Sequence, residues 1–375
     1  MKLSTDTPQK NSGPISKRLG PWLPMAVLFL SAALLQGCAR LCPGFGQWYA
    51  RHIYPLLLNT LGRLTGLLPF SAAELGLYLL AVSALLNLFF HRKRPCLLLR
   101  RFLTAAALFA FLFTAGCGVN YYRQPFSYTC GLTVRPSSTD ELYRLCQALT
   151  DQISLAAKKL DQAAPGLAGQ TQPAKLSFRQ LRYYGQASRQ AMKGLGEEFS
   201  DLSGFYPMPK PLLVSSILSV QQLCGIYSPF TVEANYNRDM PLYNIPHTIC
   251  HELSHLKGFM REDEANFIGY MACIRSDDPV FNYSGYLMGW VYAGNALAAA
   301  DWDAYMELRD RLPQKALTDL AYNNAFWDSY DSKVAQAATK VNDTYLKLQD
   351  QEDGVKSYGR VVDLMLAYYR KHPLE

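Results

Sequence analysis

The stretch "HTICHELSHLKGFMREDEANF", His247 to Phe267, decides the fold. It places His251, Glu252 and His255 in an HExxH pattern, followed by a glycine and a run of acidic residues. In an α-helix, residues four apart lie one above the other on the same face, about 6 Å apart along the axis. The pattern therefore predicts a helix that brings the imidazoles of His251 and His255 to one common point.

Two imidazoles arranged in this way are typical of a metal site. Histidine nitrogens bind Zn²⁺ at about 2.0 to 2.1 Å, so His251 and His255 are expected to be two ligands of one zinc ion. Glu252 lies roughly 100° further round the helix, close enough to an open metal position to take a proton from bound water. We therefore expect Zn²⁺ as the cofactor and Glu252 as the catalytic base.

The motif does not supply the third ligand, and the residues that follow it offer two candidates. Gly258 is expected to end the helix in a left-handed conformation and to let the chain turn back. A second helix beginning at Arg261 would aim Glu262 at the metal and let Asn266 hydrogen-bond a ligand imidazole. Glu264 points about 200° away from Glu262 on that helix, and it remains the alternative third ligand.

Neighbouring side chains with metal-binding chemistry are expected to lie outside the ligand set. His247 lies about 12 Å along the axis from His255, and Cys250 and Cys273 are interpreted as buried thiols. The nine cysteines form no CxxC pair, which gives no support to a zinc ribbon or a thioredoxin-type site. If His247, Cys250 or Glu264 did supply a fourth ligand, the site would be closed and structural.

Three apolar stretches are long enough, or nearly so, to cross a hydrocarbon core as helices of roughly 20 residues. They are Trp22 to Ala39, Ala72 to Phe90 and Phe102 to Val119. A fourth stretch, Ile53 to Phe70, carries Arg63 at its middle and leucines at helical spacing. It is predicted to be an amphipathic helix lying at the membrane interface.

Charge predicts how the chain is oriented. Residues 1–118 hold twelve Lys/Arg and two acidic residues, and the basic side chains collect in the N-terminal tail and in the loop "HRKRPCLLLRR". Such segments stay in the cytoplasm. We therefore expect a multi-pass anchor, residues 1–119, in the cytoplasmic membrane, with residues 120–375 forming an extracytoplasmic domain.

Two further expectations concern partners and processing. The outer residues show no Lys/Arg stripe interleaved with aromatics, so the lipid bilayer is expected as a partner and nucleic acid is not. The segment "LLQGC", ending at Cys38, resembles the end of a bacterial lipoprotein signal, and cleavage before Cys38 remains the alternative to three spans.

The outer residues predict an α+β fold that is mostly helical and has a small sheet. From Ser137 the chain shows apolar side chains at helical spacing after Ser/Thr/Asp capping residues, which predicts one amphipathic helix ending near Pro165 and Gly166. The short β-branched or aromatic stretches 211–220 and 229–237 are predicted as strands. From Pro246 onward the chain is predicted to be mainly helical.

At these residues the chain resembles known families. The gluzincin branch of the zincin metallopeptidases takes its third ligand from an ExxA[DN] helix, here "EDEAN", whereas the HExxHxxGxxH type would need a histidine in place of Arg261. The segments "NYYRQPF", "GIYSPFTVEANYN" and "VNDTYLKLQDQEDGVKSYGRVVDLML", taken with the HExxH stretch, are similar to an uncharacterised bacterial membrane family, domain of unknown function thirty-eight-ten. That resemblance implies a zinc-site protein anchored in a bacterial cytoplasmic membrane, and it names no substrate.

The zincin resemblance also implies where a peptide would bind. Zincins have an edge strand upstream of the metal helix that pairs with an extended substrate. Thr231 to Asn237 is the candidate, in which Glu233 and Asn235 alternate with Val232 and Ala234. The same alternation fits a plain core strand.

A donor to the transition-state oxyanion is also expected near the metal. The candidates are Tyr283, Tyr286 and Tyr358, three of the 24 tyrosines. The predicted function is a membrane-anchored zinc peptidase acting on peptides or proteins outside the membrane. The alternative is a non-catalytic envelope protein with a structural or sensory zinc site.

Overall fold

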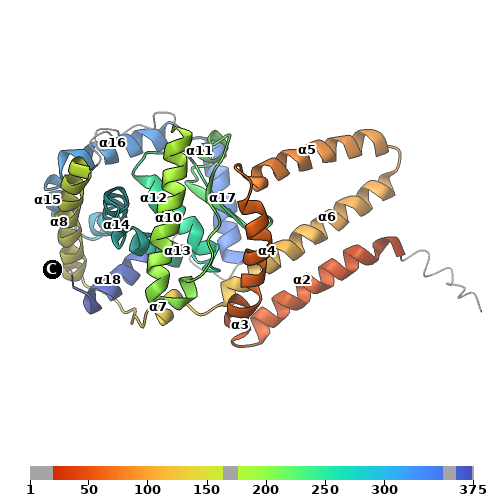
Figure 1. Cartoon of the computed structure of the whole chain (residues 1–375), viewed down its shortest axis with the longest axis horizontal. Coiled ribbons are helices and arrows are strands. Elements are labelled where there is room, and N and C mark those ends of the chain that lie inside the picture. The colour runs from red at the N-terminus through yellow and green to blue at the C-terminus, as the bar shows by residue number, and fades with distance from the viewer. Residues whose placement is uncertain (1–19, 164–175, 349–359, 374–375) are drawn as a thin grey trace, which may run out of the picture.

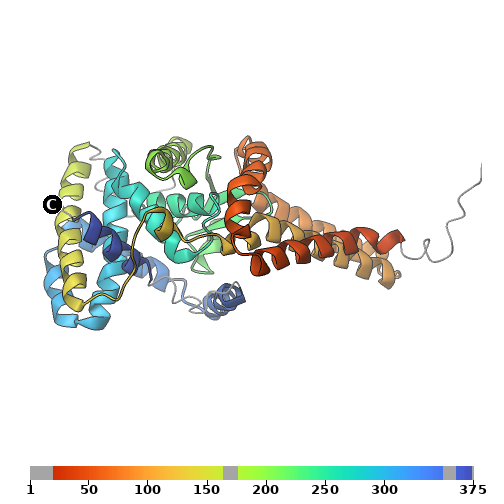
Figure 2. The same cartoon turned by 90° about the horizontal axis from the view of Figure 1, so that it is seen from below.

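A computed structural model describes residues 20–163, 176–348 and 360–373 of the 375-residue chain. Three long apolar helices extend from one side of a helical body, and that body contains one small sheet (Figures 1 and 2). The prediction of a mostly helical chain with a small sheet is therefore confirmed.

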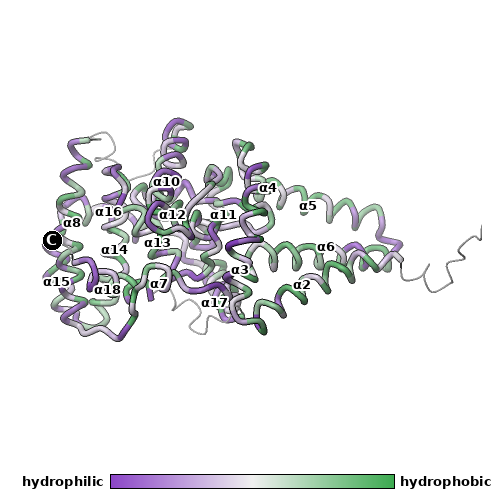
Figure 3. Tube along the Cα trace, turned by 60° about the horizontal axis from the view of Figure 1, so that its bottom comes forward, coloured by the Kyte–Doolittle hydropathy of each residue, from purple (hydrophilic) through white to green (hydrophobic). Residues whose placement is uncertain are grey.

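The three extended helices are α2 (Leu23–Leu41), α5 (Ala72–His91) and α6 (Pro95–Gly116). A short 3-10 turn, η1 (Gly20–Trp22), precedes α2, and another, η2 (Gly118–Tyr122), follows α6. All three helices are long and apolar enough to cross a membrane. Hydrophobic residues predominate along the protruding part of these helices (Figure 3). The number of candidate spans agrees with the prediction, and it indicates that the protein associates with a membrane.

The body is built from helices of very different lengths, packed around one main core. Its helices are α3 (Phe45–His52), α4 (Tyr54–Gly66), α7 (Phe126–Thr129), α8 (Thr139–Ala163), α10 (Phe178–Glu198), η3 (Ser200–Leu202), α11 (Ser216–Ser219), α12 (Asn244–His255), α13 (Glu262–Ile274), α14 (Pro279–Ala300), α15 (Trp302–Asp310), α16 (Gln314–Asp328), α17 (Lys333–Leu348) and α18 (Val361–Lys371).

Helix α8 forms where its spacing predicts. Its N-terminus is closed by a reciprocal pair: the Ser138 hydroxyl accepts from Glu141 N–H, and the Glu141 carboxylate accepts from Ser138 N–H, each at 3.1 Å. The apolar positions Leu142, Leu149 and Ile153 are all buried in the main core. The apolar stripe, rather than helix propensity alone, therefore fixes this helix against the body.

Helix α4 corresponds to the predicted amphipathic helix, and one of its faces packs on the body. Tyr54 and Leu58 are buried, and Leu58 belongs to the main core. The opposite face still exposes Leu56, Leu64 and Leu67, which are 60%, 65% and 81% accessible. This part of the 1–119 segment is thus joined to the body on one side and presents apolar side chains on the other.

The sheet has the order β1–β3–β2, with β1 (Lys210–Pro211) parallel to β3 (Glu233–Tyr236) and β2 (Gly225–Ser228) antiparallel to it. The prediction of a strand within 229–237 is confirmed, but the prediction of that strand as a substrate-binding edge is wrong. It is the central strand, and Glu233 and Asn235 are only 2% and 0% exposed. The edge strands are β1 and β2, and Gly225 of β2 lies against Glu252 of α12.

The predicted strand 211–220 is also wrong over most of its length. Only Pro211 lies in β1, and the short helix α11 follows. The reason is a buried carboxylate: Glu74, at the start of α5, accepts the backbone N–H groups of Leu213 and Val214 at 2.7 and 2.9 Å. Amides used in this way cannot pair with a neighbouring strand.

Candidate metal centre

The turn between α12 and α13 has the geometry that the sequence predicts. Helix α12 ends at His255, and Gly258 adopts a φ of +82°, a conformation that favours glycine. Its N–H donates to the His255 carbonyl at 2.9 Å. The chain then reverses, and α13 begins at Glu262 directly after Arg261.

A second glycine lets the two helices approach closely. A Cβ atom at Gly269 would lie 3.1 Å from the His247 carbonyl oxygen and 3.2 Å from the backbone nitrogen of His251, which is tighter than ordinary packing. A side chain there would push α13 away from α12. Sequence reasoning missed this residue, although a glycine inside a helical pattern often marks close packing.

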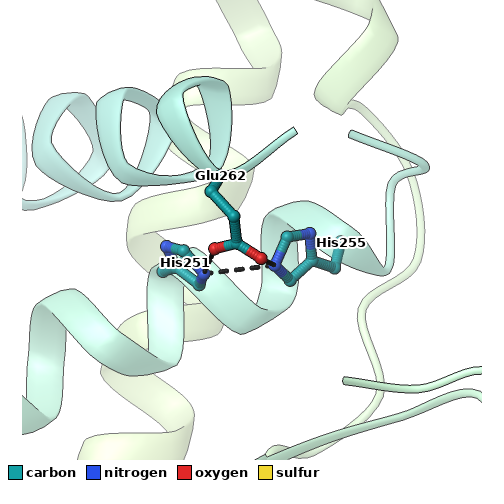
Figure 4. Close-up of side chains that lie close together, drawn as sticks. All are labelled: His251, His255 and Glu262. Atoms are coloured by element: carbon teal, nitrogen blue, oxygen red, sulfur yellow. Dashed lines mark hydrogen bonds and ion pairs between the residues drawn. The ribbon is translucent and has the colours of Figure 1, made fainter. Parts of the chain in front are cut away.

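The close approach brings three donor groups together from the two helices (Figure 4). The Nε2 atoms of His251 and His255 are 3.1 Å apart, and the Glu262 carboxylate lies 3.2 Å from the first and 3.9 Å from the second. Donors bound at about 2.0 to 2.2 Å in a tetrahedral shell lie about 3.3 to 3.6 Å from one another. The three residues therefore fit around a single small cation.

The outer nitrogens of both rings are held by hydrogen bonds. His251 Nδ1 lies 2.8 Å from Asn266 Oδ1, and His255 Nδ1 lies 2.7 Å from the Phe259 carbonyl oxygen. Since both oxygens only accept, each Nδ1 carries the hydrogen and donates it. When both rings are neutral, the Nε2 lone pair of His251 faces that of His255. These lone pairs repel each other unless a cation lies between them.

Charge within the cluster is unevenly distributed. Burial lowers the pKa of His255 to about 4 and keeps that ring neutral. Burial also opposes a charge on His251, but the hydrogen bond and the charge of Glu262 outweigh it and raise the pKa of His251 above its usual range. The cluster thus favours one positive charge next to the Glu262 carboxylate, a charge that a proton or a metal ion can provide.

Glu252 lies beside the cluster and against the edge strand β2. It is 5% exposed, and burial raises its pKa to about 8. The backbone N–H of Tyr227 in β2 donates to its carboxyl group, whereas Oε2 has no partner among the described residues. A Cβ atom at Gly225 would lie 2.5 Å from Glu252 Oε1, so this position in β2 has room only for glycine.

The other candidate ligands point elsewhere. Glu264 is buried on the opposite side of α13 and accepts the Phe126 N–H at 3.0 Å. The His247 ring lies 3.2 Å from the Asn266 carbonyl oxygen, and the Cys250 thiol is buried next to Cys273. Among the described residues, the group that can hold a metal consists of three side chains: His251, His255 and Glu262.

The structure describes two of the three predicted oxyanion donors. The Tyr283 hydroxyl donates to Asp319 at 2.6 Å, and Tyr286 lies near Tyr368 of α18. The Tyr283 hydroxyl is thus directed at Asp319, the role of Tyr286 stays a prediction, and Tyr358 lies outside the described residues. The tyrosine of α14 that does reach the site is Tyr292, which donates to Asn266 Oδ1 at 3.1 Å.

Comparison with known proteins places the chain in a family. Residues 49–366 match the family described as "Protein of unknown function (DUF3810)". No curated protein and no solved structure matches the chain. Because the match extends from α3 to α18 and includes two candidate spans, the sheet and the metal centre, the chain belongs to the DUF3810 family.

Proposed function

We propose that the chain is a membrane-anchored, zinc-dependent peptidase with a zincin-like body that hydrolyses peptide bonds of peptides or proteins outside the cytoplasmic membrane. The observation that supports this most strongly is the meeting of two imidazole lone pairs and a carboxylate at one point. Two nitrogens and one carboxylate oxygen form a donor set used by catalytic zinc sites, which leave one position open.

His251, His255 and Glu262 would hold the ion. When bound, zinc would polarise the scissile carbonyl and lower the pKa of a bound water molecule. Asn266 and the Phe259 carbonyl orient the two rings through Nδ1, so that both Nε2 atoms stay directed at the ion. The hydroxyl of Tyr292 supports Asn266 in that orientation.

Glu252 is the group that would move the proton. It follows His251 directly in the chain, it lies under the edge strand, and one of its oxygens lacks a partner among the described residues. A buried carboxylate with a free oxygen can accept a proton from the attacking water and pass it to the leaving amine. The other oxygen, Oε1, lies against Gly225, so the carboxylate is beside the strand where a peptide backbone can add.

The proposed side of the membrane follows from charge. The basic loop between α5 and α6 holds Arg92, Lys93 and Arg94, and such loops stay in the cytoplasm. The body is attached to the opposite ends of these helices (Figure 1). It would therefore face outward.

The test measures metal and hydrolysis in the same full-length preparations. Wild type should contain zinc and cleave a mixed-sequence quenched peptide library, whereas Glu252→Gln should keep the zinc and lose hydrolysis by about 10²- to 10⁴-fold. The matched control is Glu264→Gln, a buried glutamate on α13 that does not face the metal centre, and it should keep both.

One outcome would favour a non-catalytic protein. The three donor side chains are only 8% to 16% exposed, as in a closed structural site. X-ray absorption showing four protein ligands on the zinc, together with no hydrolysis by wild type, would contradict the peptidase.

A further inference from the structure

Two of the candidate spans are bonded directly to the sheet. At the start of α5 the N–H groups of Ala72 and Ala73 donate to the Glu233 carboxylate of β3 at 3.1 and 2.8 Å. At the end of α6 the Gly116 carbonyl accepts from the Tyr227 hydroxyl of β2 at 2.9 Å. Strands β2 and β3 therefore lie at the level of the span ends.

The length of α6 places this level at the membrane surface. Arg100 and Arg101 mark the interface at the basic end of the helix. A core of about 30 Å is crossed by about 20 helical residues, so a crossing that begins at Phe102 ends at about residue 121. Gly116 lies about five residues before that point, about 8 Å along the helix, so the sheet that it contacts lies near the boundary of the bilayer.

The turn between β2 and β3 reaches further along the span. The Phe230 ring packs edge-on against Phe109 of α6, with ring centroids 5.2 Å apart. Phe109 precedes Gly116 by seven residues, about 10 Å along the helix. A Cβ atom at Gly116 would lie 2.6 Å from the Pro229 carbonyl oxygen, so the turn is held tightly against α6.

The metal centre is adjacent to the same contacts. The Tyr227 ring, whose hydroxyl binds the end of α6, lies 6.2 Å from the His255 ring. On the other side, the Cys117 thiol lies 3.5 Å from the sulfur of Met260, two residues before Glu262. The ligands are thus within one or two side chains of the end of a span.

Strand β2 offers the place where a substrate can add. Among the described residues it has a neighbouring strand on one side only, and its Gly225 lies against Glu252. Its Ile226 is 46% exposed. An extended chain can pair with such an edge through backbone hydrogen bonds.

From these contacts we infer that the site acts on polypeptides held at the surface of the same membrane, whose scissile segment leaves the bilayer beside α6 and adds to the edge of β2. The inference rests on the proposed peptidase and narrows its substrate class. A chain anchored in the same bilayer emerges at the height of the metal centre and meets it at a high effective concentration.

The first arm of the test measures the height of the strand. A fluorescent amino acid replaces Ile226 in the full chain, which is reconstituted in phosphatidylcholine/phosphatidylglycerol vesicles with lipids brominated near the headgroup. Bromine should quench the label at 226 strongly and should leave the same label at Asp303, exposed in α15 at the far end of the body, unquenched. Equal quenching at the two positions would overturn the inference.

The second arm measures hydrolysis in the same vesicles. A mixed-sequence peptide is offered free, or joined to one transmembrane helix through spacers of about 3, 10 or 30 residues. The short-spacer form should be cleaved at least about tenfold faster than the free form and faster than the long-spacer form. Equal rates, or cleavage that requires the long spacer, would overturn the inference and leave the peptidase standing. No hydrolysis of any form by wild type would reject the peptidase itself.

Discussion

Two of the buried glutamates, Glu233 and Glu252, are bonded in opposite ways. Glu233 receives the Lys210 ammonium and two backbone N–H groups from the start of α5. Glu252 receives the N–H of Tyr227, and its Oε2 has no partner among the described residues. The two side chains are 2% and 5% exposed, so burial alone does not distinguish them.

The difference separates a structural carboxylate from a reactive one. Burying a charge is costly unless it is paired and hydrogen-bonded, and the pairing of Glu233 joins a span to the sheet. Glu252 is left incompletely bonded beside three converging metal donors. An oxygen without a partner does not by itself mark a reactive group, because Glu264 Oε2 also lacks one among the described residues. Of Glu252 and Glu264, only Glu252 lies beside the metal donors.

The largest effect on folding is expected at the paired glutamate. Glu233→Gln should lower the free energy of unfolding by about 3 to 5 kcal/mol, because it leaves the Lys210 ammonium buried without a counter-charge. Thermal unfolding in detergent measures the loss. The double variant Glu233→Gln/Lys210→Met should regain much of the lost stability. If Glu233→Gln alone were as stable as wild type, the contrast between the two glutamates would disappear.

A smaller effect, on zinc affinity, is expected from the residues that hold the ligand imidazoles in place. Asn266→Ala removes the acceptor of the His251 Nδ1–H, and it should weaken zinc binding about 10- to 100-fold. Competition with a zinc chelator measures the affinity. Tyr292→Phe removes only a donor to the same Asn266 oxygen and should have a weaker effect in the same direction. If Asn266→Ala bound zinc as tightly as wild type, Asn266 would not position the ligand.

The smallest effect on folding is expected at Glu252. Glu252→Gln replaces a buried carboxyl group that lacks a full set of partners, so the free energy of unfolding of the metal-free protein should change by less than about 1 kcal/mol or should rise. Chemical denaturation after chelation measures it. A loss as large as that of Glu233→Gln would show that Glu252 is structural.

The local parts of the site could be predicted from the sequence. Helical spacing alone places His251 and His255 on one face, and the glycine at 258 marks the reversal before Glu262. The same spacing directs Glu264 away from Glu262, as the structure has it. These features depend on residues within a few positions of one another.

The parts that could not be predicted depend on distant partners. The central position of β3 follows from β2, a four-residue strand too short to show alternation. The Tyr283 hydroxyl is directed away from the site because it donates a hydrogen bond to Asp319, 36 residues further along the chain. Likewise, the amides of 213 and 214 are taken by Glu74, about 140 residues earlier in the chain.

The central claim is that His251, His255 and Glu262 hold one zinc ion, and zinc content tests it most directly. The full chain is needed, because Tyr54 and Leu58 of α4 are buried in the body. Mass spectrometry of purified, zinc-equilibrated protein should find one zinc per chain in wild type and in Glu264→Gln, and none in His255→Ala. Wild type without zinc, or His255→Ala with as much zinc as wild type, would contradict the account.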